Sequence, residues 1–225
     1  MNGRAQVLLS WSTGKDSAWA LHVLRQRGEV EVVALATTFN EAVDRVAMHA
    51  VRRELAVAQA EAAGLPLWSV PLPWPCSNEE YERRWRGVIE RARAAGVTHV
   101  AFGDLFLADV RAYRERQMEN TGLSPLFPLW TSDSATPALA RAMLAGGLRA
   151  ILTCVDPQQL APSFVGDAYD AAFLAALPAS VDPCGERGEF HTFCCAGPMF
   201  GKPIACAVGE KVLRDGFHFA DVMPM

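Results

Sequence analysis

The chain has 225 residues, of which 51% are hydrophobic and 20% are charged, proportions typical of a soluble globular protein with a sizeable core. Its length allows one large domain or two smaller ones. The net charge of −4 argues against a nucleic-acid-binding protein with a strongly basic surface.

The six cysteines show no CxxC pair, which argues against a zinc ribbon and an iron–sulfur site. The first residues lack the long apolar core of a signal peptide, and the apolar stretch at 171–178 is too short to cross a membrane. We therefore expect a cytoplasmic protein without a membrane partner, whose thiols are free.

The first hundred residues alternate between strand and helix patterns. Buried or β-branched runs predict strands at 6–12, 32–39, 67–73 and 97–105. Amphipathic runs predict helices at 16–28, 46–63 and 78–95. This alternation is typical of an α/β fold with a parallel sheet, right-handed crossovers and helices on both faces.

The rhythm changes after about residue 125. Here the patterns predict a helix at 136–147, a strand at 149–156, a helix at 164–177 and a strand-like tail with prolines and glycines. We interpret this part as a smaller α+β domain, which divides the chain into residues 1–127 and 128–225.

Three polar stretches follow predicted strands: residues 12–17 after the first, residues 36–40 after the second and residues 103–105 after the fourth. Ligands of open α/β sheets bind beyond the carboxyl ends of the strands. The sequence therefore predicts that these stretches meet at one binding crevice.

The stretch STGKDS is suited to an anion. Gly14 permits unusual backbone angles, and the amides after it open a helix, where unpaired N–H groups attract phosphate. Lys15 adds a positive charge, and the hydroxyls of Ser12 and Ser17 can donate hydrogen bonds. Asp16 could cap the helix or approach a magnesium ion. The alternative is a capped turn that binds nothing, because the Walker pattern GxxxxGK[ST] is absent.

SWSTGKDS resembles the SGGxDS pyrophosphate loop of the N-type ATP pyrophosphatases, which have the adenine nucleotide alpha hydrolase (HUP-type) fold. Other stretches resemble the diphthine–ammonia ligase family: FGDL, the residues Arg111, Tyr113, Arg114 and Glu115, PLW at 128–130, DPCGERGEFHT at 182–192 and GP at 197–198. The resemblance covers essentially the whole chain. Only three of the 21 basic residues are lysines, a composition that suggests a bacterial member of the family.

This resemblance implies an enzyme that uses ATP and Mg²⁺ to convert a carboxylate into an acyl-adenylate, which ammonia turns into an amide with release of AMP. Residues 12–17 would hold the pyrophosphate, and the backbone of Ala36, Thr37 and Thr38 would bind adenine. Gly103 would allow close approach of the nucleotide, and Asp104 would hold magnesium or ribose.

The resemblance also implies catalytic residues. Glu186, Glu189 and His191 would orient ammonia or remove its proton, with Thr192 near the substrate. The alternative for this cluster is a network that stabilises a loop, or a zinc site made by His191 with Cys184, Cys194 and Cys206. His49, which precedes a predicted helix, either lies near the substrate and nucleotide or is a structural histidine. Arg111 and Glu115 lie four residues apart on one helix face, where they are either part of the site or a surface ion pair.

One residue departs from the family pattern. Thr13 stands where the loop usually has its first glycine, and threonine adopts a positive φ only at a cost. The loop is therefore expected to bind phosphate only if position 13 is extended or if the loop geometry has shifted. A bacterial source would lack the diphthine acceptor, leaving an unidentified small-molecule or protein carboxylate. A base-adenylating tRNA-modifying enzyme and a nucleotide-binding sensor remain alternatives. The small second domain is compatible with a homodimer.

Overall fold

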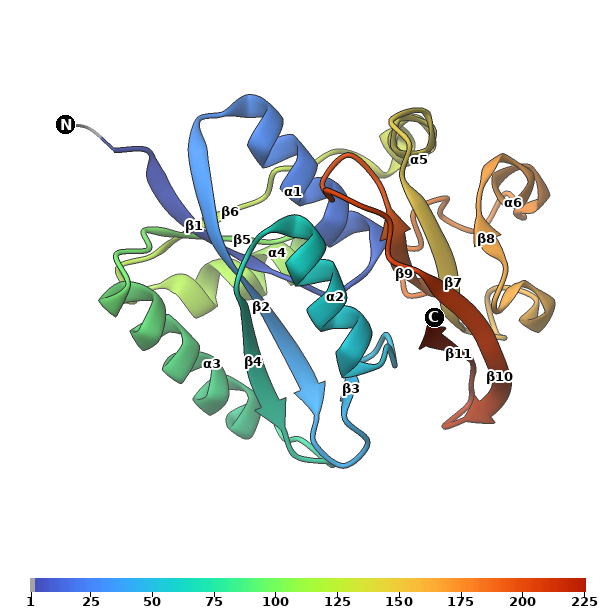
Figure 1. Cartoon of the computed structure of the whole chain (residues 1–225), viewed down its shortest axis with the longest axis horizontal. Helices are drawn as coiled ribbons and strands as arrows, with labels where there is room; N and C mark the ends of the chain where they lie inside the picture. The colour runs from blue at the N-terminus through green and yellow to red at the C-terminus, as the bar shows by residue number, and fades with distance from the viewer. Residues whose placement is uncertain (1–2) are drawn as a thin grey trace.

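Two β-sheets organise residues 3–225, the part of the chain that the computed structural model describes (Figure 1). Sheet A contains β1 (Ala5–Ser10), β2 (Val30–Asn40), β3 (Arg45–Val46), β4 (Leu67–Leu72), β5 (His99–Ala101) and β6 (Ser124–Leu126). Its order is β3-β2-β1-β5-β6, with β4 also paired to β2. All pairings are parallel except that of β3 with β2.

Four helices cover the two faces of sheet A: α1 (Lys15–Arg27), α2 (Arg53–Ala63), α3 (Asn78–Ala94) and α4 (Ala108–Met118). Successive side chains of a strand point to opposite faces. Accordingly, Val7 and Leu9 of β1 pack in the core cluster that contains α1 residues, whereas Leu8 packs in the cluster that contains Trp85 of α3. The predicted α/β fold, with a mostly parallel sheet and helices on both faces, is confirmed.

Sheet B is antiparallel and lies beside sheet A (Figure 1, yellow to red). It contains β7 (Arg149–Val155), β8 (Ala168–Tyr169), β9 (Phe190–Ala196), β10 (Cys206–Arg214) and β11 (Phe217–Pro224). Its helices are α5 (Thr136–Ala145) and α6 (Ala171–Ala176), with 3₁₀ turns at Asp133–Ala135 and Pro162–Phe164. The smaller α+β part is thus confirmed as a second sheet.

The two sheets share buried core residues. One apolar cluster contains Leu9 of β1 and Leu21 of α1 together with Leu152 of β7 and Cys194 of β9. This shared core fixes sheet B against the side of sheet A on which α1 lies. The division of the chain at residues 127 and 128 stays a prediction.

Two predicted helices are wrong in part. The helix predicted at 46–63 begins only at Arg53, because Met48 and Ala50 have φ values of 64° and 55°, which no α-helix accommodates. The helix predicted at 164–177 is interrupted by Gly166, with a φ of 83°, and by β8, so that only Ala171–Ala176 is helical. Neither interruption leaves a strong local signal.

The structure also contains a fifth parallel strand that we did not predict, β6, which pairs with β5. Among residues 3–225, no helix combines the length and the apolar character needed to cross a bilayer.

Candidate active site

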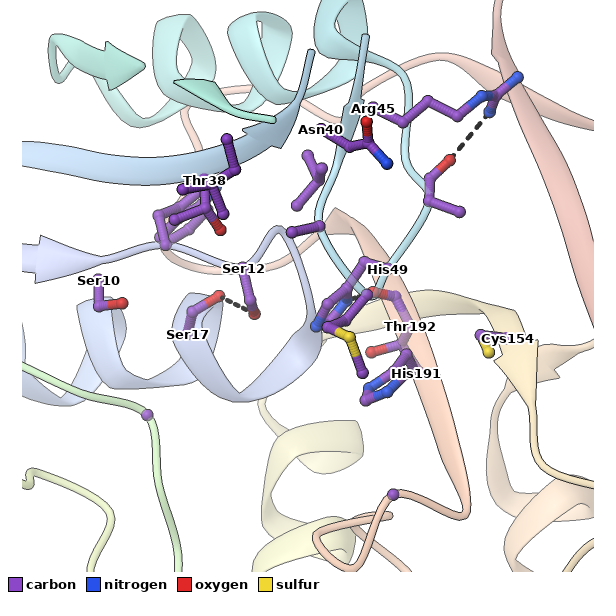
Figure 2. A pocket seen from close by; sticks show the side chains of 18 of the residues that line it. Ser10, Ser12, Ser17, Thr38, Asn40, Arg45, His49, Cys154, His191 and Thr192 are labelled. Carbon is purple, nitrogen blue, oxygen red and sulfur yellow. Dashed lines mark hydrogen bonds between the residues drawn. The ribbon is translucent and has the colours of Figure 1, made fainter. Parts of the chain in front are cut away.

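A cavity of about 740 Å³ lies where the carboxyl ends of the sheet A strands face sheet B (Figure 2). One side is lined by the turn after β1, the ends of β2 and β4 and the residues that follow β5. The other side is lined by the loop at 185–188, by β7 and β9, and by the hairpin of β10 and β11. The predicted convergence of strand ends is therefore present, and the C-terminal part completes the cavity.

The turn after β1 lies at the point where the strand order of sheet A reverses, since β1 has β2 on one side and β5 on the other. Such a switch point is where open α/β sheets bind ligands. Gly103 comes very close to the start of α1 here: a Cβ atom at this position would lie 3.0 Å from the Ser17 nitrogen. Close packing of the β5 end on the α1 N-terminus therefore requires glycine.

Thr13 has a φ of 69°, so the first of the two alternatives, an extended position 13, is wrong. Two contacts hold its carbonyl oxygen, which accepts hydrogen bonds from the Cys194 amide at 2.9 Å and from Gln59 Nε2 at 2.9 Å. Gln59 in turn accepts a hydrogen bond from the Trp11 indole at 2.8 Å. The surrounding structure thus imposes on threonine the left-handed backbone that glycine would adopt freely.

The serines of the turn face the cavity (Figure 2). Ser12 and Ser17 are joined by a hydrogen bond of 3.1 Å between their hydroxyls, and both line the cavity. The Lys15 amide donates to Thr192 Oγ1, whereas the Asp16 and Ser17 amides that follow it have no partner four residues back in the chain. Together these groups form an arrangement of donors suited to an anion.

Lys15 is oriented toward sheet B. Its side chain is buried, and its Nζ contacts the Asp16 carboxylate at 2.8 Å and the Cys184 carbonyl. Burial is the largest single influence on the pKa of Lys15 and acts to lower it, but the charge and hydrogen bond of Asp16, together with Cys184 and Glu186, outweigh burial and the pKa is raised. Its backbone N–H donates to Thr192 Oγ1 at 3.1 Å, which ties the turn to β9.

Asp104 lies at the cavity wall opposite Arg114 of α4, with 3.5 Å between Oδ2 and Nε. Burial raises the pKa of Asp104, and the Arg114 charge partly offsets this. Its buried Oδ2 has no hydrogen-bond partner among residues 3–225. No group of three or more His, Cys, Asp or Glu side chains in the described chain is arranged to hold a metal ion.

Glu186 and Glu189 occupy different positions. Glu186 lines the cavity, and its Oε1 accepts the Leu105 amide at 2.7 Å. Burial raises the pKa of Glu186 to about 7. Glu189 is 1% exposed and accepts the amides of Asp182 and Arg187, both at 2.9 Å, so that it fixes the loop and does not line the cavity.

His191 and His49 both line the cavity and pack against each other, with 4.7 Å between ring centroids (Figure 2). His49 Nδ1 lies 3.0 Å from the Thr192 carbonyl, which can only accept, so Nδ1 carries the proton and Nε2 has the free lone pair. Burial lowers the pKa of His49 to about 4 and that of His191 to about 3, with the Lys15 charge as a further cause. Both rings are neutral at pH 7.

The predicted adenine segment alternates along β2. Ala36 and Thr38 line the cavity. Thr37 points to the other face, where its hydroxyl donates to the Trp11 carbonyl at 2.8 Å. Arg111 and Glu115 form an ion pair of 2.8 Å on α4, and Arg111 packs on the rings of Phe127 and Trp130. Neither residue of this pair lines the cavity, and their catalytic role stays a prediction.

Several residues that line the cavity lie in no sequence motif that would have indicated a role in a site. Cys154 comes from β7, and Arg214, Phe217 and Phe219 come from the hairpin of β10 and β11. They belong to ordinary strand patterns near the C-terminus, and only the pairing of distant strands brings them to the site.

The chain matches the family model described as "Diphthamide synthase N-terminal domain" over residues 4–125. It is 28% identical over 236 residues to diphthine–ammonia ligase of Danio rerio, covering 94% of this chain and 90% of that protein. It is 26% identical over 237 residues to diphthine–ammonia ligase of Rattus norvegicus, covering 94% of this chain and 86% of that protein. The protein of that name in Schizosaccharomyces pombe is 28% identical over 227 residues, covering 92% of this chain and 37% of the longer relative. The chain belongs to the diphthamide synthase family.

Proposed function

We propose that this protein is an ATP-dependent ligase that forms AMP and joins ammonia to a carboxylate. The observation that carries the proposal is a single cavity containing three features: an anion-binding turn at the switch point of sheet A, a carboxyl group with a pKa of about 7, and two neutral imidazoles. The name that the relatives carry, diphthine–ammonia ligase, describes the same class of reaction.

In the first step, the cavity would hold ATP along the carboxyl ends of the strands. The adenine would lie along Ala36 and Thr38, and the turn at 12–17 would donate hydrogen bonds to the β- and γ-phosphates. An oxygen of the acceptor carboxylate forms a bond to the α-phosphorus while the bond from that phosphorus to the bridging oxygen breaks. Pyrophosphate leaves, and its charge is stabilised by the donors of the turn.

Asp104 suits a magnesium ion: its buried Oδ2 lies 3.5 Å from Arg114 Nε but accepts no hydrogen bond from residues 3–225, and Mg²⁺ is usually bound by one or two carboxylates together with substrate phosphates. Asp16 is less available, since both of its oxygens accept hydrogen bonds from Lys15. When bound, the ion would neutralise phosphate charge.

In the second step, ammonia attacks the acyl carbon, the new C–N bond forms and the bond to the AMP oxygen breaks. The nitrogen must lose one proton to give a neutral amide. The ionised form of Glu186 can accept this proton, because its pKa of about 7 is close to the working pH. The neutral rings of His49 and His191 can accept hydrogen bonds from ammonia, but their low pKa values make them poor proton acceptors.

A screen for pyrophosphate release tests the proposal. The protein with ATP, Mg²⁺ and ammonium chloride is incubated with a library of carboxylate metabolites and with proteins from a cell extract. We expect at least one acceptor to stimulate formation of AMP and pyrophosphate in equal amounts. Release of ADP and phosphate would contradict the proposal, and tight ATP binding without any turnover would indicate a nucleotide sensor.

A further inference from the structure

One part of the cavity wall is built from three neighbouring strands of sheet B, β9, β7 and β11. Phe219 of β11 is in register with Cys154 of β7, and Cys154 is in register with His191 of β9. All three line the cavity, so they form one row across the sheet. The row changes from a polar imidazole, next to the turn, to an aromatic ring at the hairpin.

The hairpin tip continues this surface. Asp215 and Gly216 have φ values of 49° and 86°, as in the tight two-residue turns that rigidly connect antiparallel strands. Arg214 and Phe217 flank this turn as a registered pair and line the cavity. The Arg214 guanidinium lies 6.0 Å from the centre of the Phe219 ring. The centres of the Phe217 and Phe219 rings are 6.5 Å apart.

Arg214 differs from the other lysine and arginine side chains that line the cavity in whether a carboxylate of the protein pairs with it. Those others each have a carboxylate partner: Lys15 with Asp16 at 2.8 Å, Arg45 with Asp221 at 2.7 Å and Arg114 with Asp104 at 3.5 Å. Arg214 is exposed to solvent, unlike those three, and forms no ion pair with any carboxylate of residues 3–225. A positive charge without a protein partner at a cavity wall attracts an anionic ligand.

We propose that this hairpin end is the acceptor subsite and that the acceptor carries two anionic groups separated by an apolar segment. The reacting carboxylate lies near His191, the apolar segment lies over Cys154 and the two phenylalanines, and the second anionic group contacts Arg214. Neighbouring strands are separated by about 4.8 Å, so the row spans about 10 Å. The inference rests on the proposed amide ligase function and names its substrate class.

Binding of α,ω-dicarboxylates tests the subsite without requiring turnover. Isothermal titration calorimetry is carried out on the full chain with Mg²⁺ and saturating α,β-methylene-ATP, which resists cleavage at the reacting bond. The ligands are dicarboxylates from succinate to sebacate and the monocarboxylates of equal length. We expect the longer dicarboxylates to bind at least about tenfold more tightly than the matching monocarboxylates.

Two pairs of variants locate the effect on the hairpin. Arg214→Gln should remove the advantage of the dicarboxylates and leave monocarboxylate binding unchanged, whereas Lys211→Gln on the same strand, outside the cavity, should change neither. Phe217→Ala should weaken both ligand classes severalfold, whereas Leu213→Ala, whose side chain is 65% exposed, should not. Circular dichroism melting verifies that each variant is folded.

The inference is overturned if no dicarboxylate binds more tightly than its monocarboxylate, or if Arg214→Gln and Lys211→Gln have equal effects. The outcome is separable from that of the proposed function. Binding that depends on Arg214, without pyrophosphate release from ATP, would contradict only the ligase reaction. Pyrophosphate release that is stimulated by acceptors with a single anionic group and unaffected by Arg214→Gln would contradict only the subsite.

Discussion

Thr13 is the most strained residue of the anion-binding turn, because a β-branched side chain at a φ of 69° crowds its own backbone. Glycine at position 13 would remove this strain, which costs the folded state about 1–2 kcal/mol. Glycine also makes the unfolded chain more flexible, which lowers the free energy of unfolding by about 0.5–1 kcal/mol. We therefore expect Thr13→Gly to leave the free energy of unfolding unchanged or to raise it by up to about 1 kcal/mol, as measured by urea denaturation.

Thr153 provides the matched control, because it is also buried but lies in the extended strand β7. Thr153→Gly should lower the free energy of unfolding by at least ~1 kcal/mol. An equal loss for Thr13→Gly would mean that the left-handed backbone at position 13 is not a source of strain.

Glu186 determines the expected pH dependence of amide formation. Its pKa is raised by burial to about 7, so the carboxylate is mostly protonated below this pH and cannot accept a proton from ammonia. With free ammonia held constant, we expect the rate to rise with pH up to an apparent pKa of about 7. Glu186→Gln should lower the rate by about 100-fold or more and abolish this rise.

Glu210→Gln is a suitable control, since Glu210 is exposed on β10 and outside the cavity. This variant should retain both the rate and the pH profile of the parent. If Glu186→Gln also kept the profile, another group would have to accept the proton.

The two half-buried histidines of the cavity predict a pH dependence of stability. Their pKa values fall from the ordinary 6.5 to about 4 and about 3 on folding, so the unfolded chain binds more protons between these values. Stability from this source is present above pH 6.5 and is lost as the pH falls toward 4. His49→Gln should lessen the loss over that interval by about 2 kcal/mol, measured by urea denaturation at several pH values. An unchanged slope would show that His49 remains protonated on folding.

At the scale of secondary structure, the contact of β5 with α1 positions the turn. Gly103→Ala would place a methyl group 3.0 Å from the Ser17 nitrogen and 3.2 Å from the Asp16 carbonyl carbon, so the strand end or the helix must shift. We expect a loss of about 1–3 kcal/mol in the free energy of unfolding and weaker ATP binding.

Gly87 in the middle of α3 tests the specificity of this effect, because a Cβ there meets no atom within 4 Å. Gly87→Ala should stabilise the protein by about 1 kcal/mol and leave ATP binding unchanged. Similar behaviour of the two alanine variants would contradict the close approach at Gly103.

The parallel strands and their helices could be predicted because each carries a local signal. Buried runs mark β1 and β2, and Gly28 and Gly64 end α1 and α2 in left-handed conformations. The turn at 47–52 could not be predicted, because its apolar residues fit a helical period. Its Arg52 is held instead by Asp221, which is 169 residues away.

The candidate site could also be predicted only in part: residues in local motifs were found, and residues placed by the pairings of sheet B were not. Ser12, Asp104, Glu186 and His191 were recognisable from local motifs, and the structure brings them to one cavity. The buried position of Glu189 and the cavity-facing position of Arg214 depend on the loop and strand pairings of sheet B, which the residues around them do not specify.

At the scale of the whole molecule, sheet B supports the site as well as covering it. The β9 strand donates the Cys194 amide to Thr13, and its Thr192 hydroxyl accepts the Lys15 amide. The same strand places His191 beside His49. The turn at 12–17 and the proposed acceptor subsite are therefore joined through β9, which in the proposed reaction would hold the acceptor carboxylate in line with the α-phosphorus.

Isotope transfer provides the most direct test of the proposed reaction. An acceptor labelled with ¹⁸O in its carboxylate is incubated with the protein, ATP, Mg²⁺ and ammonia, and the products are analysed by mass spectrometry. Attack of the carboxylate on the α-phosphorus predicts one ¹⁸O atom in the AMP and pyrophosphate without label. Label in phosphate released together with ADP, or AMP without label, would contradict the account.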